Sequence, residues 1–348
     1  MRVLVTGGAG FIGSITVRHL LDAGHSVMVL DSLERGHEEA VDSRAWLVRG
    51  SVGDLALLDD VLPDVDVVVH CAGYIEVAES QRDPDLYYEK NLREPARMLD
   101  RMVLHGVRRL VFSSTAAVYG EPQSLPIVED AACSPVNVYG ASKLAFERLI
   151  DVTSDSGALD AVRLRYFNVA GAWPDGSLGE AHDPETHIVP RVLGALAEGS
   201  ARFSVYGTDY PTPDGTCVRD YIHVLDLAEA HRSAVEYLGD GHASAVCNLG
   251  SGRGYSNLEV ARTCAEVVGR DLEIENSPRR PGDPAVLVAS NARAQEILGW
   301  TPSRGLEEMV HDAWEWHRTH PRGYEGSPSR FIAGHDAVSG PGGSADQG

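Results

Sequence analysis

The sequence predicts an α/β protein with a doubly wound parallel sheet, followed by a smaller C-terminal α/β lobe. Three observations predict this fold class: apolar runs of strand length alternate with helical segments, a glycine-rich turn follows the first run, and an acidic residue ends the second. The 348 residues leave room for both units. We expect a first domain at 1–171 with a return segment near 216–250, a discontinuous lobe at 172–325, and a disordered Gly- and Ser-rich tail at 331–348.

The first apolar run, residues 2–6, predicts a buried parallel strand, and residues 14–23 predict the helix after it. The turn between them has the glycine spacing G-x-x-G-x-x-G. Its glycines permit, in chain order, a tight turn, a close approach to a pyrophosphate and close helix–strand packing. The start of the helix directs free N–H groups at the phosphates. The cofactor-binding candidates of this turn are Gly7, Gly10, Phe11, Ile12 and Gly13.

An acidic side chain ends the second predicted strand, residues 26–30. Asp31 is placed to accept hydrogen bonds from the adenosine ribose hydroxyls, and its carboxylate would repel a ribose phosphate. Because Arg35 follows only after Glu34, the cofactor we expect is NAD rather than NADP. The alternative is a glycine-rich turn that holds no ligand.

The next two predicted strands, 45–48 and 65–70, add candidates at their carboxyl ends, where ligands of such sheets bind. After the first strand, Asp54 is placed to contact the adenine amine, to cap the helix that begins at Leu55, or to do both. Small residues that let a cofactor approach follow the second strand: Ala72 and Gly73.

A Tyr–Lys pair follows the strand predicted at 110–113. Tyr139 and Lys143 are four residues apart and share one helical face, where an ammonium group favours the phenolate and makes the tyrosine a usable base. Such a base beside a nicotinamide is the arrangement that the oxidation of an alcohol needs. Thr115 is our candidate for holding the substrate alcohol, whereas Ser113 is equally well explained as a hydrogen bonder at the strand end.

Composition excludes several classes of partner. The net charge of −21 argues against nucleic acid or an acidic membrane surface. Five cysteines without C-x-x-C or histidine spacing favour small apolar residues in a reducing cytosol, so we predict neither disulfides nor a metal site. No apolar run approaches the length of a membrane span and no signal peptide precedes the first strand, so we expect a cytoplasmic protein.

Eight segments carry a family resemblance: 6–13, 112–120, 139–143, 164–168, 206–216, 218–224, 279–283 and 314–317. Together they resemble the extended short-chain dehydrogenases/reductases and, within that group, the UDP-galactose 4-epimerases. The resemblance extends over about 1–324. The stretch Tyr-Gly-Thr-Asp-Tyr-Pro-Thr at 206–212 and Arg-Asp-Tyr-Ile-His at 219–223 are the parts most specific to the epimerases.

The resemblance implies a Rossmann domain, tightly held NAD, and epimerisation at carbon 4 of a UDP-hexose through a transient 4-keto sugar. It implies that Tyr139 takes the proton of the 4-hydroxyl, that Lys143 lowers the pKa of this phenol and binds the nicotinamide ribose, and that Thr115 binds the same hydroxyl. The remaining cofactor-binding candidates are Asn91, Ser113 and Tyr166. The implied substrate contacts are Asn168 at the diphosphate, Arg219 and Arg280 as phosphate-binding cations, Asp283 at the uridine ribose, Tyr206 at the uracil, and His187 and Ile188 in a loop that uses its backbone. The helices at 86–105 and 142–151 would form the four-helix bundle of a homodimer.

Three positions depart from the family pattern. Ile75 stands where many members have a phosphate-binding lysine, and Glu76 beside it meets either a sugar or solvent. Leu287 stands where a tyrosine in some members blocks substrates with an N-acetyl group on carbon 2. We therefore expect UDP-N-acetylhexosamines to be accepted as well, unless a neighbouring side chain fills the space.

Three rival functions are distinguishable. A 4,6-dehydratase would need acids next to Thr115, where two alanines stand. A UDP-uronate 4-epimerase or decarboxylase stays open, with Arg93 as a cation for the carboxylate. A catalytically silent dinucleotide sensor would have lost the residues of the chemistry, and Tyr139, Lys143 and Thr115 are all present.

Overall fold

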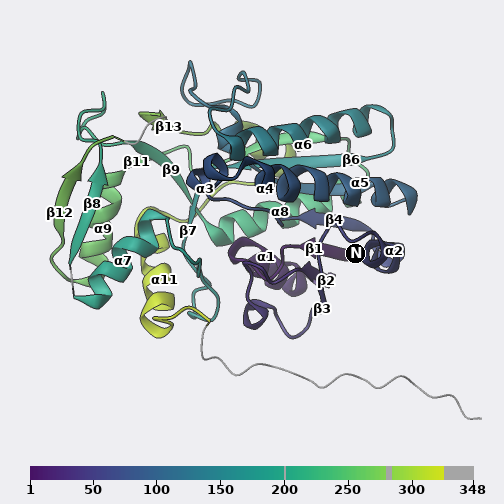
Figure 1. The fold of residues 1–348 in the computed structure, drawn as a ribbon, viewed down its shortest axis with the longest axis horizontal. Coiled ribbons are helices and arrows are strands. Elements are labelled where there is room, and N and C mark those ends of the chain that lie inside the picture. Colours follow the sequence, from purple (N-terminus) through teal and green to yellow (C-terminus); the bar gives the residue numbers. More distant parts are fainter. Residues whose placement is uncertain (200, 280–283, 325–348) are drawn as a thin grey trace, which may run out of the picture.

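A seven-stranded parallel sheet forms the centre of the larger unit (Figure 1). The computed structural model describes residues 1–199, 201–279 and 284–324. The strand order is β10-β6-β5-β4-β1-β2-β3, so the predicted doubly wound parallel sheet is confirmed. The strands are β1 (Arg2–Thr6), β2 (Ser26–Asp31), β3 (Trp46–Arg49), β4 (Val67–His70), β5 (Arg109–Thr115), β6 (Asp160–Tyr166) and β10 (Ala245–Leu249).

Helices cover both faces of this sheet. Successive residues of a strand point to opposite faces, and because both sets are apolar here, each face has to be buried. In β1, Val3 and Val5 pack with the helices of one face, whereas Leu4 packs with those of the other. The first layer contains α1 (Phe11–Asp22), α8 (Val224–Gly239) and α10 (Ala292–Leu298). The second contains α2 (Leu55–Val61), α5 (Glu94–Leu104) and α6 (Val138–Asp155). None of the described helices is long and apolar enough to cross a membrane.

The helix expected at 86–105 is present, but it contains a π-helical turn that the sequence did not predict. The chain forms α3 (Val77–Arg82), α4 (Pro84–Tyr88), a π-helical turn at Glu89–Arg93 and then α5. Pro95 in the first turn of α5 has no N–H to continue the α-helical hydrogen bonds from the preceding residues, which favours a break there. Short 3-10 turns lie at Glu38–Ala40, Leu62–Asp64 and Ala116–Val118.

In the described part of the chain, the smaller lobe has two small sheets and three helices (left in Figure 1). One sheet contains β7 (Asn168–Ala170), β9 (Val218–His223), β11 (Gly254–Ser256) and β13 (Val286–Leu287), and the other pairs β8 (Arg202–Tyr206) with β12 (Glu273–Ser277). The helices are α7 (Ile188–Glu198), α9 (Asn257–Val268) and α11 (Leu306–Thr319). Their apolar faces share one core that includes Val192, Val260 and Val310.

The two units are interleaved along the chain. After passing through β9 in the smaller lobe, the chain returns to the large sheet, where β10 pairs with β6 in parallel. The expected limits at 171 and near 216–250 stay predictions, because a pairing pattern does not define a domain boundary. The carboxyl ends of the parallel strands therefore face elements of the smaller lobe, and ligands of doubly wound sheets bind at these strand ends.

Candidate functional site

A cavity of about 1520 Å³ lies at the carboxyl ends of the parallel strands and is lined by both units. Its size suits a dinucleotide together with a second nucleotide-linked ligand, because sites for a single small molecule are usually about 300–1,000 Å³. Most of the sequence-predicted candidates line it: Gly7, Gly10, Phe11, Ile12, Gly13, Asp31, Ala72, Gly73, Thr115, Tyr139, Lys143, Tyr166, Asn168, His187, Arg219 and Leu287.

The glycine-rich turn brings the start of α1 against the end of β1. A Cβ atom on Gly13 would lie 2.0 Å from the carbonyl oxygen of Gly7, so no side chain fits at this helix–strand contact. Gly7 has φ +71° and abuts the backbone of Ala72. A Cβ on Gly10 would meet only that carbonyl oxygen, at 3.4 Å, and would otherwise point toward the cavity. This open cradle at a helix N-terminus fits a pyrophosphate.

Asp31 has a second role that sequence reasoning missed. Its buried carboxylate accepts hydrogen bonds from the backbone N–H groups of Ala9 (2.9 Å) and Leu33 (2.8 Å). It therefore holds the glycine-rich turn against the end of β2. Because each carboxylate oxygen accepts more than one hydrogen bond, Asp31 can do this and still bind a ribose hydroxyl.

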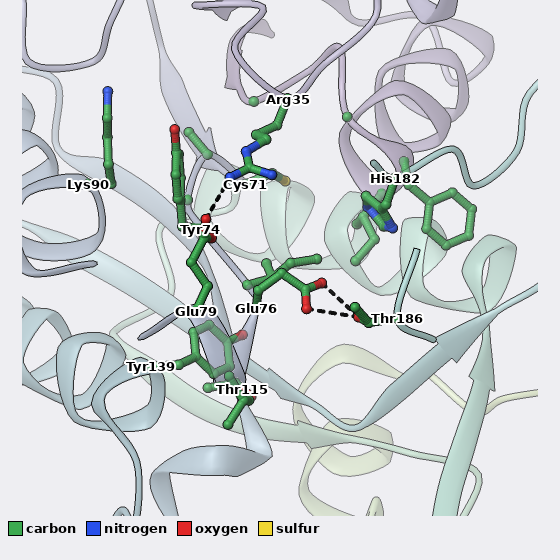
Figure 2. A pocket seen from close by; sticks show the side chains of 18 of the residues that line it. Arg35, Cys71, Tyr74, Glu76, Glu79, Lys90, Thr115, Tyr139, His182 and Thr186 are labelled. Carbon is green, nitrogen blue, oxygen red and sulfur yellow. Dashed lines mark hydrogen bonds and ion pairs between the residues drawn. The ribbon is translucent and has the colours of Figure 1, made fainter. Parts of the chain in front are cut away.

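Thr115 and Tyr139 lie side by side on the cavity wall (Figure 2). Thr115 ends β5, and Tyr139 lies in the first turn of α6, whose start is capped by Asn137. Burial raises the pKa of the Tyr139 phenol, and the neighbouring Thr115 hydroxyl opposes this rise. The phenol is therefore held beside a hydroxyl that can share a proton with it.

Lys143 lies one turn further along the same face of α6. Its Nζ donates to the carbonyl oxygen of Ser113 (3.2 Å) and faces the backbone at Gly73, where a Cβ would come within 3.1 Å. Burial lowers the pKa of Lys143 to about 8, although the charges of Cys71 and Glu147 oppose this change. The expected lowering of the pKa of Tyr139 by Lys143 stays a prediction, because only burial and Thr115 act on that phenol here.

Several candidates do not line the cavity. Asp54 caps α2 by accepting from the N–H groups of Ala56 and Leu57, as the capping alternative predicted. Asn91 holds the backbone of Tyr74 through two hydrogen bonds of 2.8 and 2.9 Å. Candidates that do not line the cavity are Asp54, Leu55, Asn91, Ser113, Ile188 and Tyr206. Arg280 and Asp283 lie outside the described residues.

Ser113 makes the strand-end hydrogen bonds that the alternative predicted. Its hydroxyl lies 2.9 Å from Nε2 of the buried His231 and 3.3 Å from the sulfur of Cys71. These contacts join the ends of β4 and β5 to α8. Ser113 therefore supports the wall on which Thr115 stands.

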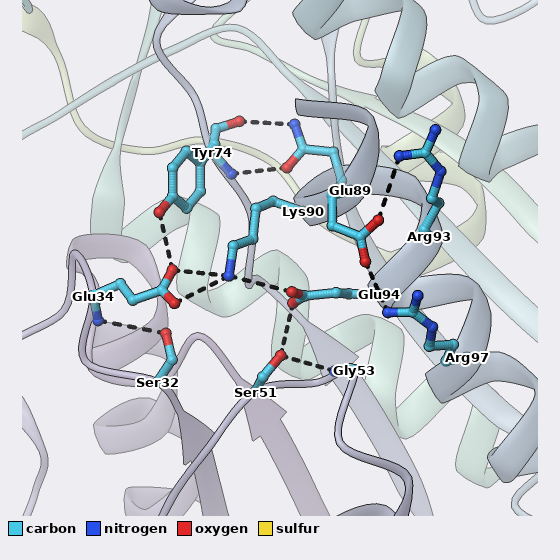
Figure 3. A network of polar contacts seen from close by, with 11 residues as sticks. Ser32, Glu34, Ser51, Gly53, Tyr74, Glu89, Lys90, Arg93, Glu94 and Arg97 are labelled. Atoms are coloured by element: carbon cyan, nitrogen blue, oxygen red, sulfur yellow. Dashed lines mark hydrogen bonds and ion pairs between the residues drawn. The ribbon is translucent and has the colours of Figure 1, made fainter. Parts of the chain in front are cut away.

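A polar network at another part of the cavity places one cation, Lys90, on the cavity wall (Figure 3). Lys90 lies 3.0 Å from Glu34 and 3.2 Å from Glu94, and the Tyr74 hydroxyl donates to Glu34 (2.9 Å). Glu34 and Lys90 both line the cavity. The sequence did not indicate this network, because its members come from separate segments.

Glu76 is half-buried and has a partner across the cavity. Both of its carboxylate oxygens accept from the Thr186 hydroxyl, at 2.8 and 2.9 Å (Figure 2). Ile75 lines the cavity beside it. Arg93, the cation considered for a uronate carboxylate, is exposed, pairs with Glu89 (3.4 Å) and does not line the cavity.

A cluster of four ionisable side chains lines the cavity in the segment before α7, and of these only His187 was among the sequence-predicted candidates. They are Glu180, His182, Glu185 and His187. Burial lowers the pKa of both histidines, but the neighbouring carboxylates outweigh it, raising the pKa of His182 to about 9 and that of His187 well above its usual value. Burial also disfavours the Glu180 carboxylate, yet the histidines hold its pKa well below the usual range. The alternation of glutamate and histidine at 180–187 is the sequence pattern that could have indicated this cluster.

Comparison with known proteins decides the family. Residues 3–250 match the model of the NAD dependent epimerase/dehydratase family. The chain belongs to this family. It is 46% identical over 327 residues to the UDP-glucose 4-epimerase of Lacticaseibacillus casei, covering 93% of this chain and 99% of that protein.

Solved structures of this family show the same fold. A crystal structure of a UDP-glucose 4-epimerase matches with a TM-score of 0.91 and 42% identity, covering 93% of this chain and all of that one. The enzyme of Bifidobacterium longum, solved in complex with NAD⁺ and UDP, matches with a TM-score of 0.87 and 37% identity, covering 93% of this chain and 100% of that one. The family is NAD-dependent, and the chain has both the glycine cradle and the Asp31 carboxylate in the cavity where NAD would bind.

Proposed function

We propose that the protein interconverts UDP-galactose and UDP-glucose by NAD-dependent epimerisation at carbon 4. The observation that carries the proposal is the neighbouring pair of Thr115 and Tyr139 on the wall of one cavity with the glycine cradle of Gly10. A proton acceptor, a hydroxyl partner and a dinucleotide site are what reversible oxidation of a sugar alcohol needs. The family membership supports the same reaction.

In this mechanism, Tyr139 as phenolate accepts the proton of the sugar 4-hydroxyl while carbon 4 is oxidised to a ketone. The same phenol returns the proton when the ketone is reduced on its opposite face, so the base is restored in each turnover. Thr115 hydrogen-bonds the reacting oxygen and stabilises the charge that develops on it. NAD⁺, when bound, supplies the hydride acceptor and a positive charge that favours the phenolate.

The two ends of the substrate are held differently. Asn168 and Arg219 line the cavity and are assigned to the diphosphate, and Arg191, one turn into α7, adds a further cation on this wall. The hexose must turn over between oxidation and reduction, so it has to be held less firmly than the diphosphate. Arg280 and Asp283 remain assigned to the phosphate and the uridine ribose by resemblance alone.

We also propose that UDP-N-acetylhexosamines are substrates. Leu287 in β13 lines the cavity and packs against the small apolar cluster of Ala116, Val118 and Ile127. A leucine leaves more room here than a tyrosine would, and this room suits an acetamide group. The uronate alternative is not favoured, because Arg93 does not line the cavity.

We further propose a homodimer in the cytoplasm. α5 and α6 carry large apolar side chains that are unusually exposed: Val103 (43%), Leu104 (65%) and Val152 (68%). Pairing these helices with those of a second copy would bury them. All five cysteines lie within the described residues and none forms a disulfide, which suits a reducing compartment. Light scattering of the purified protein measures the number of chains in the particle.

The decisive experiment incubates the purified protein with UDP-galactose, and separately with UDP-N-acetylgalactosamine, without added NAD. Chromatographic conversion to the gluco partner is the expected result. Tyr139→Phe should retain NAD yet lose about 10²–10⁴-fold in turnover, because the base is gone but the cradle is intact. No conversion of either substrate, even with NAD supplied, would overturn the proposal.

A further inference from the structure

The cluster before α7, formed by Glu180, His182, Glu185 and His187, takes no part in the proposed chemistry. Each of these residues offers one ligand atom, and the four atoms lie within 4.8 Å of one another. The two histidines offer Nδ1 and the two glutamates offer carboxylate oxygens. Two imidazoles and two carboxylates are a donor set that suits a borderline divalent ion such as Zn²⁺.

The spacing of these atoms fits a tetrahedral ion. Zn²⁺ lies about 2.0–2.1 Å from nitrogen and oxygen ligands, so neighbouring ligand atoms of a regular tetrahedron are about 3.3 Å apart. His187 Nδ1 lies 2.9 Å from Glu180 Oε1 and 3.1 Å from Glu185 Oε1. His182 Nδ1 lies 3.2 Å from Glu180 Oε1 and 3.6 Å from Glu185 Oε2. The three distances that share Glu180 Oε1 or Glu185 Oε1 lie close to the tetrahedral value, whereas the 3.6 Å contact uses the other Glu185 oxygen.

The hydrogen bonding of His182 is an independent sign that this cluster takes a ligand. Its Nδ1 atom is buried and makes no hydrogen bond to any residue in the described part of the chain, although carboxylate oxygens lie close by. A buried polar nitrogen without a hydrogen bond is costly. An ion between the four side chains would satisfy it without moving the backbone.

The surroundings keep these ligands in place. The Trp316 indole donates to the Glu180 carbonyl oxygen (3.0 Å), and the His187 N–H donates to Glu185 Oε1 (2.7 Å). Such contacts around the ligands orient a metal site and limit its rearrangement.

The segment also bridges the two units of the protein. Thr186 donates to Glu76 beside α3, His37 Nε2 lies 2.9 Å from the Ala181 carbonyl oxygen, and Arg35 donates to the Asp183 carbonyl oxygen (3.2 Å). Figure 2 places His182 on the same side as Thr186 and apart from Tyr139 and Thr115. An ion here would therefore fix the cavity wall and would not touch the reacting atoms.

We propose that Glu180, His182, Glu185 and His187 form a structural site for one Zn²⁺-like divalent ion, which fixes the wall segment 180–187 over the cavity. The site has no step in the epimerisation. Its presence is independent of the proposed function, because it is measured by metal binding rather than by turnover.

The test uses untagged full-length protein that has been stripped with EDTA and titrated with Zn²⁺ in a calorimeter. We expect one ion per chain, a tetrahedral visible spectrum when Co²⁺ replaces Zn²⁺, and no comparable binding of Mg²⁺. Ion binding should also raise the thermal midpoint, because it stabilises only the folded chain.

Substitutions then locate the site. His187→Gln and Glu185→Gln should each weaken Zn²⁺ binding by about 10-fold or more. His242→Gln is the matched control, because His242 is exposed, stacked on Tyr237 and outside the cluster. Circular dichroism verifies that each variant is folded, and Glu185→Gln serves as the second variant if His187→Gln does not fold. Substoichiometric binding, or equal binding by folded cluster variants and wild type, would mean that the four side chains are only an ion-pair cluster and would overturn the proposal.

Discussion

Two glycines of the same turn should respond differently to the addition of one methyl group. In Gly13→Ala the new Cβ would lie 2.0 Å from the Gly7 carbonyl oxygen and 2.9 Å from the Gly8 Cα. These are backbone atoms, so α1 must move away from β1. In Gly10→Ala the nearest atom is at 3.4 Å, an ordinary contact, and the φ of −84° is one that alanine adopts freely.

The magnitudes follow from this geometry. Overpacking usually costs about 1–3 kcal/mol of stability. We expect about 3 kcal/mol for Gly13→Ala, because the opposing atoms are backbone atoms that cannot rotate away. At about 2–4 °C per kcal/mol, Gly13→Ala should lower the thermal midpoint by about 6–12 °C. Gly10→Ala should change the midpoint of the NAD-free protein by about 2 °C or less, since surface changes usually cost within about 0.5 kcal/mol.

For NAD affinity, by contrast, Gly10→Ala should have a large effect although it barely changes stability. The methyl group of Gly10→Ala points to where the pyrophosphate approaches, so the same overpacking cost falls on the complex instead of the free protein. A cost of about 1–3 kcal/mol there corresponds to a loss of about 5- to 150-fold in affinity. Gly13→Ala should lose affinity and stability together.

The assay is a thermal melt of the NAD-free protein combined with calorimetric NAD titration. Gly194→Ala is the control, because its Cβ meets nothing within 4 Å in the middle of α7 and the helix should gain up to about 1 kcal/mol. The reasoning is refuted if Gly13→Ala melts within about 1 °C of wild type, where about 6 °C is expected, or if Gly10→Ala loses as much stability as Gly13→Ala.

Three further outcomes are expected. Leu287→Tyr should reduce turnover of UDP-N-acetylgalactosamine by about 10-fold or more while that of UDP-galactose changes by less than about threefold; equal losses on both substrates would show that the position does not select the carbon-2 group. Glu147→Ala leaves the buried Arg165 guanidinium, 2.5 Å from that carboxylate, without its main partner, so urea denaturation should show a loss of about 3–5 kcal/mol, and a loss below about 1 kcal/mol would contradict a tightly paired charge. Burial lowers the pKa of His70 to about 3 and of His231 to about 4. The unfolded chain binds a proton on each below about pH 6.5 while the folded chain does not, so stability is lost as the pH falls from 6.5, by about 1.4 kcal/mol per histidine at pH 5.5. Between pH 7.5 and 5.5, the free energy of unfolding of His231→Asn should fall by about 1.4 kcal/mol less than that of wild type, as measured by urea denaturation. An equal fall in both proteins would show that His231 does not contribute to the pH dependence.

The nucleotide half of the site was accessible from sequence because its signals are local. The glycine spacing, the alternation of apolar runs and the acid after β2 all lie within one short segment, and each depends on backbone geometry that nearby residues determine. The position of Thr115 at the end of β5 was likewise readable from the end of an apolar run.

The rest depends on which segments meet in space. The carboxylate of Asp31 is used by the backbone of Ala9, and Lys90 reaches Glu34 from a distant turn. Neither contact leaves a periodic pattern in the chain. The π-helical turn within the helix expected at 86–105 was missed because it adds one residue to a turn without ending the helix. The effect of Lys143 on Tyr139 stays a prediction; its ammonium group also donates to a strand-end carbonyl, a contact that spacing along a helix does not reveal.

The late return of β10 to the large sheet has a consequence for biosynthesis. A nascent chain that has emerged from the ribosome as far as Tyr166 presents β6 as an edge, with a row of unpaired backbone groups, until residues 245–249 are made. Vectorial folding of the nucleotide-binding half therefore cannot finish before most of the other half has been translated. During that interval the open edge is a template for pairing with neighbouring chains on a polysome, which makes this stage the one most dependent on chaperones.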